Sequence, residues 1–222
     1  GRRWYGLGRP FLESGMAKSG KATTIAVIGA GQMGEALIGG WLAAKTVPPD
    51  ALFATDASAE RRDVMKRRFG VRTGSDNRDA ASWADVVVLA VKPQILDEVM
   101  KGLSSALAGK LVLSIAAGVT IAHLAKLAPK GARVVRVMPN TPVQVRDGVS
   151  ALSFGAGVTD KDQQIVRRLF EAVGRAVVVE ERLMDAVTGL SGSGPRCEQV
   201  LAHLSGLACI VALHQMPWSS NG

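Results

Sequence analysis

The chain has 222 residues, of which 47% are hydrophobic, 21% charged and 5% aromatic, and it carries a formal net charge of +8. This length can bury a substantial core, and the composition is that of an ordinary globular protein. No uninterrupted apolar run reaches the roughly 18 residues that a membrane span requires, so we expect no membrane partner.

Part of the positive charge lies on two expected helices, residues 58–69 and 160–173. Among the basic residues on these two helices are Arg61, Arg62, Lys66, Arg67, Arg68, Arg167 and Arg168. We interpret them as solvated helix faces and expect no nucleic-acid partner, because aromatics are scarce and no base-stacking pattern is visible. An anionic cofactor and an anionic substrate would also suit this charge.

The compartment is only weakly indicated. Residues 1–22 show neither helical nor strand periodicity, and we exclude them from the fold as an extraneous segment. Met16 could be the native start, and a basic targeting peptide is the alternative. Cys197 and Cys209 form no disulfide framework and no metal-binding pattern with nearby histidines. We therefore expect a cytoplasmic protein without a metal, or a plastid or other organellar one if the first segment is a targeting remnant.

The fold is organised around residues 23–34, TTIAVIGAGQMG. A short buried strand, Ile25–Ile28, runs into a G-x-G-x-x-G turn, and a helix-like segment comes next at residues 35–44. A strand before this turn and a helix after it are the context of a dinucleotide-binding site. The alternative is a glycine-rich turn that binds nothing.

Each glycine of this turn has a separate expected role. Gly29 allows the tight turn out of the strand, Gly31 lets the backbone approach a pyrophosphate, and Gly34 allows close packing of the helix. The N-terminus of the helix would offer free N–H groups and partial positive charge to the phosphates.

Strands and helices alternate through the rest of the chain. Further strands are expected at residues 51–55, 71–75, 85–91, 111–115, 133–138, 149–154 and 176–179, and further helices at 58–69, 78–83, 95–107, 121–127 and 160–173. Residues 85–91 are apolar without alternation, which indicates a strand buried on both faces. This order predicts an α/β fold with a doubly wound, mostly parallel Rossmann sheet, with its ligand at the carboxyl ends of the strands.

Five segments together resemble the pyrroline-5-carboxylate reductases: IGAGQMG at 28–34, AVKPQ at 90–94, AAGVT at 116–120, RVMPNTP at 136–142 and DAVTGLSGSGP at 185–195. Their order and spacing match that family from residue 24 to residue 195. The resemblance implies an NAD(P)H-dependent oxidoreductase of amino-acid biosynthesis. Such an enzyme reduces the C=N bond of 1-pyrroline-5-carboxylate to L-proline, the last step of proline biosynthesis.

The resemblance also implies residue roles. It implies that four residues are catalytic: Lys92, Asn140, Thr141 and Glu181. Of these, Asn140 and Thr141 would lie near the nicotinamide, and Glu181 near the substrate nitrogen. The alternative for Glu181 is a surface acid beside Glu180 and Arg182. The implied cofactor-binding residues are Ile28, Gly29, Ala30, Gly31, Gln32, Met33, Gly34, Ser58, Arg61, Asn77, Ala90, Val91, Lys92, Pro93, Ile115, Ala116 and Ala117.

The choice between NADPH and NADH depends on the segment after the second strand. Asp56 could accept a hydrogen bond from a ribose 2′-hydroxyl and favour NADH, whereas Ser58, Arg61 and Arg62 could hold a 2′-phosphate. We favour NADPH.

The resemblance stops after Pro195. The family continues with a mostly helical domain that forms dimers, whereas this chain continues RCEQVLAHLSGLACIVALHQMPWSSNG. We expect a nucleotide-binding domain at 23–182 and a divergent remnant of the helical domain at 183–222, and hypothesise a shifted reading frame or an unspliced intron after Pro195. The family's dimer is then doubtful for this chain. The alternatives to the reductase are a catalytically impaired NADP-binding remnant and an oxidoreductase like the β-hydroxyacid dehydrogenases.

Overall fold

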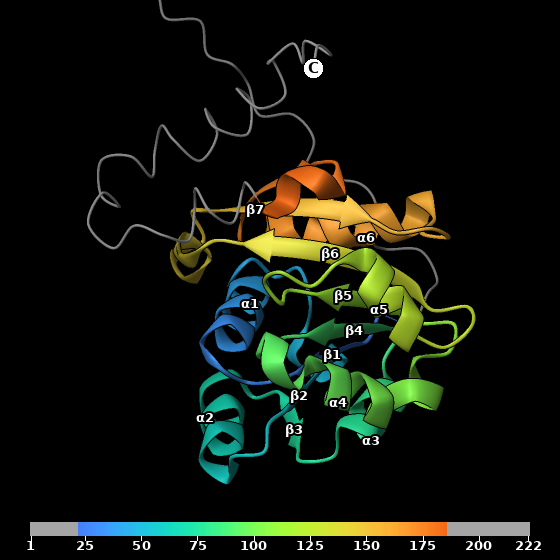
Figure 1. Cartoon of the computed structure of the whole chain (residues 1–222). Helices are drawn as coiled ribbons and strands as arrows, with labels where there is room; N and C mark the ends of the chain where they lie inside the picture. Colours follow the sequence, from blue (N-terminus) through green and yellow to red (C-terminus); the bar gives the residue numbers. More distant parts are fainter. Residues whose placement is uncertain (1–21, 186–222) are drawn as a thin grey trace, which may run out of the picture.

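The computed structural model of the chain describes residues 22–185 (Figure 1). The expected extraneous segment up to residue 21, and the expected motif and remnant from residue 186 onward, lie outside the described residues. Within 22–185, no helix has both the length and the apolar character needed to cross a membrane.

The described residues form a sheet in the order β3-β2-β1-β4-β5-β6-β7-β8. Neighbouring strands are parallel except β6 and β7, which are antiparallel and whose arrows point in opposite directions in Figure 1. The expected mostly parallel sheet is therefore confirmed. The strands are β1 (Ile25–Ile28), β2 (Leu52–Thr55), β3 (Arg72–Gly74), β4 (Val86–Leu89), β5 (Leu111–Ser114), β6 (Arg133–Pro139), β7 (Gly148–Phe154) and β8 (Gly174–Val178).

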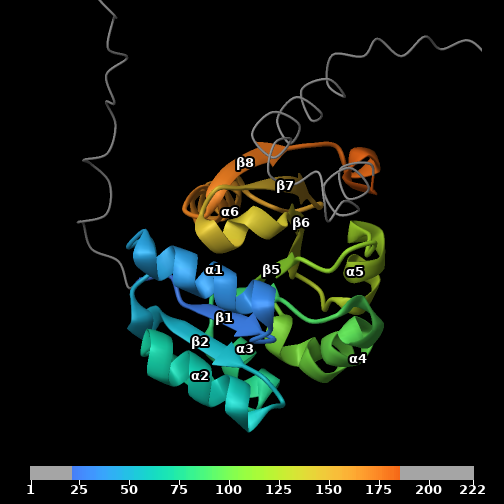
Figure 2. The same ribbon diagram turned by 90° about the vertical axis from the view of Figure 1, so that its left-hand side faces the viewer.

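Helices cover both faces of this sheet (Figure 2). Side chains of α1, α2 and α6 join one buried cluster with one face of the strands, and those of α3, α4 and α5 join a second cluster on the other face. This is the doubly wound arrangement that the sequence predicts. The helices are α1 (Gln32–Ala43), α2 (Ala59–Phe69), α3 (Asn77–Trp83), α4 (Pro93–Leu103), α5 (Ile121–Leu127) and α6 (Asp160–Glu171), with short 3-10 turns η1 (Pro49–Ala51), η2 (Ser104–Leu107), η3 (Thr141–Val145) and η4 (Glu181–Leu183).

The central strands are mostly apolar because both of their faces are covered, and the polar residues that end β2 and β5, Thr55 and Ser114, are buried as well. All residues of β1, β2, β4 and β5 are buried. A strand with one solvated face would alternate apolar and polar residues, and these strands do not. The absence of alternation in residues 85–91 was therefore a correct sign of burial on both faces.

Element ends differ from the sequence-based expectation by a few residues. The fourth strand ends at Leu89 rather than at residue 91, and α4 begins at Pro93 rather than at residue 95. Proline fits the first turn of a helix because its missing N–H has no intrahelical acceptor there. The helix α1 begins at Gln32, three residues before the expected start, because the glycine turn itself leads into the first helical turn.

Candidate functional site

The site begins at the glycine loop, which we define as residues 29–34, from the end of β1 into the first turn of α1. Gly29 has a φ of +101°, a conformation that L side chains rarely adopt. A Cβ there would lie 2.6 Å from the carbonyl oxygen of Ala90. The loop therefore leaves β1 in a tight turn pressed against the end of β4, the arrangement expected for the first glycine.

The other two glycines of the motif differ in their surroundings. A Cβ on Gly34 would lie 2.2 Å from the carbonyl oxygen of Gly29, so any side chain would disrupt the turn. A Cβ on Gly31 would have no atom within 4 Å. Gly31 has a φ of −67°, which any residue can adopt, so its missing side chain leaves open space and relieves no backbone strain.

This open space lies at the N-terminus of α1. Gly31 is the N-cap residue and provides no side-chain hydrogen bond, and the first backbone bond of the helix runs from the Glu35 N–H to the Gly31 carbonyl at 2.9 Å. The N–H groups of Gln32, Met33 and Gly34 have no acceptor within residues 22–185. Free N–H groups and the positive end of the helix dipole together bind anions, above all phosphates.

A cleft of about 680 Å³ lies beside the glycine loop. It is bounded by the ends of β1, β2 and β4 and by the helices α3 and α4. Of the expected cofactor-binding residues, Ile28, Gly29, Asn77 and Val91 line it. The side chain of Asn77 is oriented by the buried hydroxyl of Thr55, which donates to Asn77 Oδ1 at 2.6 Å.

One wall of the cleft was not expected from the sequence. It consists of residues from the loop after β3, from α3 and from α4: Ser75, Asp76, Arg78, Ile95, Glu98, Val99, Gly102 and Leu103. Ile95 is 46% exposed, although it belongs to a large apolar residue type. Ile95 lies two residues after Pro93, in the first turn of α4.

The segment after β2 is joined to the glycine loop by its acid and its first arginine. Asp56 accepts the Ala30 N–H at Oδ2 and the Ser58 N–H at Oδ1, each at 2.9 Å. Arg61 donates from Nε to the Ala30 carbonyl oxygen at 2.8 Å and lies 2.5 Å from a carboxylate oxygen of Glu35. Asp56 and Arg61 thus contact the glycine loop directly, whereas Ser58 is joined to it through the Asp56 carboxylate. Glu35, which the sequence did not single out, contacts Arg61.

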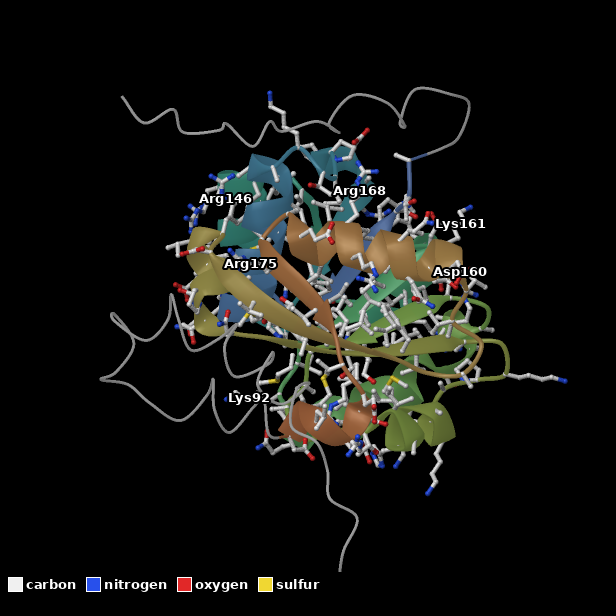
Figure 3. All side chains as sticks on the ribbon, turned by 90° about the horizontal axis from the view of Figure 1, so that it is seen from above. Lys92, Arg146, Asp160, Lys161, Arg168 and Arg175 are labelled. Carbon is white, nitrogen blue, oxygen red and sulfur yellow. The ribbon has the colours of Figure 1, made fainter. Side chains whose placement is uncertain are left out.

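The ends of β4 and β5 lie at the same edge of the sheet. The Ala90 N–H donates to the Ile28 carbonyl at 2.8 Å, and the Ile115 N–H donates to the Leu89 carbonyl at 3.2 Å. Of the expected residues that come next, Lys92, Pro93 and Ala117 are exposed, whereas Ala116 is 3% exposed. Figure 3 shows Lys92 and Arg146, the residue after η3, on one side of the molecule and Asp160 and Lys161 on the other.

Asn140 and Thr141 lie at the turn between β6 and β7. Asn140 accepts the Val149 N–H at Oδ1 (2.8 Å), and its own N–H donates to the Val149 carbonyl oxygen (3.2 Å). Asn140 therefore closes this turn with its side chain. Thr141 is exposed and begins η3, which lies against α1 in Figure 2, with Val143 buried in the cluster that contains α1.

Glu181 is not a free surface acid, although Arg182 and Glu180 do pair beside it at 2.6 Å. Its Oε1 accepts the Ile121 N–H, the first of α5, at 2.6 Å and lies 3.5 Å from Arg136 Nη1. Arg136 is only 2% exposed and also contacts Asp185 at 2.5 Å. The structure therefore joins Glu181 to β6 and to the loop before α5. Within 22–185, no three or more His, Cys, Asp or Glu side chains are grouped for a metal ion.

Known proteins that match this chain include a family of NADP-dependent oxidoreductases and curated pyrroline-5-carboxylate reductases. A family model described as NADP oxidoreductase, coenzyme F420-dependent, matches residues 24–118. A curated pyrroline-5-carboxylate reductase from Synechocystis is 40% identical over 171 residues, which are 77% of this chain and 64% of that protein.

Two solved structures extend the likeness. The pyrroline-5-carboxylate reductase from Coxiella burnetii aligns with a TM-score of 0.75 at 31% identity, covering 90% of this chain and 82% of that one. A Plasmodium falciparum pyrroline carboxylate reductase with NADP bound aligns with a TM-score of 0.72 at 29% identity, covering 88% and 71%.

The share of each relative's length that this chain covers differs between relatives. The chain spans slightly less than two thirds of the length of the Synechocystis protein. It covers 82% of the Coxiella protein at 31% identity. The chain belongs to the pyrroline-5-carboxylate reductase family.

Proposed function

We propose that this chain reduces 1-pyrroline-5-carboxylate to L-proline, using NADPH as hydride donor, with NADH as the alternative donor. One observation carries the proposal: an open glycine loop, in which three N–H groups at the start of α1 have no acceptor within residues 22–185, adjoins a cleft of about 680 Å³. Membership of the family supplies the substrate class. The Plasmodium relative, solved with NADP bound, supports the choice of cofactor.

The residues present fit a dinucleotide. The N–H groups of residues 32–34 would hold its pyrophosphate, because no atom of the described part of the chain lies within 4 Å of the place of a Gly31 Cβ. Asn77 and Val91 would line the adenosine in the cleft. Residues 90–93 and 115–117 would line the cofactor between its pyrophosphate and its nicotinamide. When bound, the cofactor supplies the hydride, and the protein supplies position and exclusion of water.

The reduction of the C=N bond requires few catalytic groups from the protein. An imine can be protonated before it reacts, so its carbon is already electrophilic, and the main requirement is to hold that carbon in place. We propose that Thr141 and Lys92, both exposed, face the substrate. We propose that Asn140 and Glu181 act by positioning the connection between β6 and β7 and the start of α5, since their side chains accept the backbone N–H groups of Val149 and Ile121.

We also propose the division of the chain expected from the sequence. Residues 23–182 form the nucleotide-binding unit, and residues 183–222 belong to the region that corresponds to the family's helical domain. In the family that domain forms dimers, and a homodimer of this chain would need it.

The test is turnover by the purified 222-residue chain. NADPH consumption should depend on 1-pyrroline-5-carboxylate, and the proline formed should equal the NADPH consumed. Oxidation of 3-hydroxy acids with NADP should be undetectable; activity there would favour the dehydrogenase alternative. Binding of NADPH without any proline formed would contradict the proposal and favour the impaired remnant.

A further inference from the structure

Glu35 is the acid nearest the glycine loop that neither the motif nor the proposed chemistry uses. It lies in the first turn of α1, and its side chain is 18% exposed. Its Oε2 lies 2.5 Å from Arg61 Nη2, and its Oε1 contacts Arg68 Nη1. One carboxylate thus offsets the charge of two arginines on α2.

Arg61 is held from two sides at once. Its Nε and Nη2 donate to the Ala30 carbonyl oxygen, and Nη2 also contacts Glu35. Its Nη1 group has no partner within residues 22–185. The guanidinium is therefore fixed over the glycine loop with one pair of N–H donors still available to an anion.

Arg61 lies close to the place where a cofactor's ribose would bind. In a nucleotide-binding sheet of this kind, the adenosine ribose lies at the end of the second strand, where an acid selects NADH or an arginine accepts the 2′-phosphate of NADPH. Here the acid is Asp56, and each of its oxygens already accepts a backbone N–H. Arg61 comes after it, in the first turn of α2.

We propose that Glu35 is a specificity-determining residue, which limits the preference for NADPH over NADH by offsetting the charge of Arg61. This rests on the proposed use of these cofactors. A 2′-phosphate carries a charge of about −1.5 to −2 at neutral pH. A carboxylate beside its arginine partner repels it, whereas a 2′-hydroxyl is almost unaffected.

The Glu35→Gln variant isolates this charge effect. Glutamine keeps a hydrogen-bond acceptor of the same shape, and the Ala30 carbonyl still holds Arg61. The positioning of the guanidinium is thus retained while one negative charge is removed. At distances of several ångströms near the surface, the affinity for a 2′-phosphate should rise about three- to tenfold, and the gain should shrink at high salt.

The experiment measures binding of adenosine 2′,5′-bisphosphate and of 5′-AMP, which differ only at the 2′ position, to the full chain by calorimetry. Glu35→Gln should tighten the bisphosphate about three- to tenfold at low salt and change 5′-AMP less than about twofold. Glu35→Asp, which keeps the charge, should behave like the parent chain. Asp63→Asn changes the net charge equally on the exposed side of α2 and should have no selective effect.

A double variant tests whether the effect passes through Arg61. Arg61→Ala should weaken the bisphosphate and NADPH more than 5′-AMP and NADH. In that background, Glu35→Gln should change the ratio of the two affinities less than about twofold, because the two residues act as one pair.

The outcomes separate this inference from the proposed function. An unchanged or weakened preference in Glu35→Gln, with the parent chain binding both nucleotides, overturns the inference and leaves the reductase proposal standing. Binding with the expected selectivity but no proline formation overturns the reductase alone. A parent chain that binds neither nucleotide overturns both.

Discussion

At the scale of single residues, Gly31 and Gly34 form a matched pair. They lie three positions apart in one loop, yet a methyl group on Gly31 would enter open space and one on Gly34 would lie 2.2 Å from a backbone oxygen. The same substitution therefore separates a binding role from a folding role.

We predict that Gly31→Ala leaves the melting temperature nearly unchanged but weakens NADPH binding at least about tenfold, because the methyl group fills the space for the pyrophosphate. Gly34→Ala should instead lower the free energy of unfolding by about 2 kcal/mol or more, since the turn must open to admit the Cβ. Thermal unfolding and nucleotide titration of both variants check this. Equal NADPH affinity in Gly31→Ala and the parent chain would contradict the proposed phosphate site.

The residues that could be predicted from the sequence are those with local signals. The three glycines indicate a turn whose geometry depends on a few neighbouring residues. The partnership of Glu35 and Arg61 spans 26 positions and carries no local signal. The same holds for Glu181, whose carboxylate meets Ile121, 60 positions earlier. The resemblance to the family implied that Glu181 lies near the substrate nitrogen, but it could not reveal that its carboxylate accepts a backbone N–H.

At the scale of elements, helix α6 is fixed to β6 through one buried carboxylate. Asp162 forms a capping box with Thr159 at the start of α6 and accepts two hydrogen bonds from Arg133, at 2.7 and 3.2 Å. Burial raises the pKa of Asp162, but the hydrogen bonds from Arg133 and Thr159 outweigh it and hold the pKa below its ordinary value of 3.8.

This lowered pKa gives a pH dependence of definite sign. The charged carboxylate stabilises the folded state, so its contribution is complete above pH 3.8 and is lost as the pH falls through the lower folded-state value. We predict that Asp162→Asn lowers the free energy of unfolding by about 1–3 kcal/mol at pH 7, and that the difference from the parent chain shrinks below about pH 4.

Urea unfolding at pH 7 and at about pH 3 measures this difference, and Asp160→Asn provides the control. Asp160 lies in the same first turn but is exposed, so its loss should change stability by less than about 0.5 kcal/mol. A difference for Asp162→Asn that is equally large at about pH 3 and at neutral pH would show that the charge is not the stabilising feature.

Most elements could be predicted from the sequence because their signals are local. The expected strand at 25–28 and helix at 121–127 have the observed bounds, Ser58 caps α2 through its side chain, and Gly70 ends it in the left-handed conformation. The antiparallel direction of β7 relative to β6 was not predicted from the sequence. A parallel connection needs a dozen or more residues, whereas only residues 140–147 separate β6 from β7. This short connection was the overlooked signal for an antiparallel pair.

At the scale of the whole molecule, the proposed cofactor site and the antiparallel end of the sheet share one core. The indole N–H of Trp41 on α1 donates to the Leu169 carbonyl of α6 at 2.8 Å, in the buried interior. A Cβ on Gly40 of α1 would meet Val173 at 2.3 Å, so α1 also lies against the segment that leads into β8. The helix whose N-terminus would bind phosphate thus packs on the last third of the described fold.

Because of this shared core, nucleotide binding should stabilise the described fold as one unit. We predict a single thermal transition, seen alike by far-ultraviolet circular dichroism and by tryptophan fluorescence. NADPH at about 100 times its dissociation constant adds about 2.7 kcal/mol to the free energy of unfolding, which raises the melting temperature by about 5–10 °C for a fold of this size. Because its NADPH affinity is at least about tenfold weaker, Gly31→Ala should lose about half of this shift or more at the same NADPH concentration, while keeping the single transition. Two transitions, of which NADPH moves only the first, would mean that β6–β8 and α6 unfold apart from the nucleotide site, and that the Trp41 contact does not couple them.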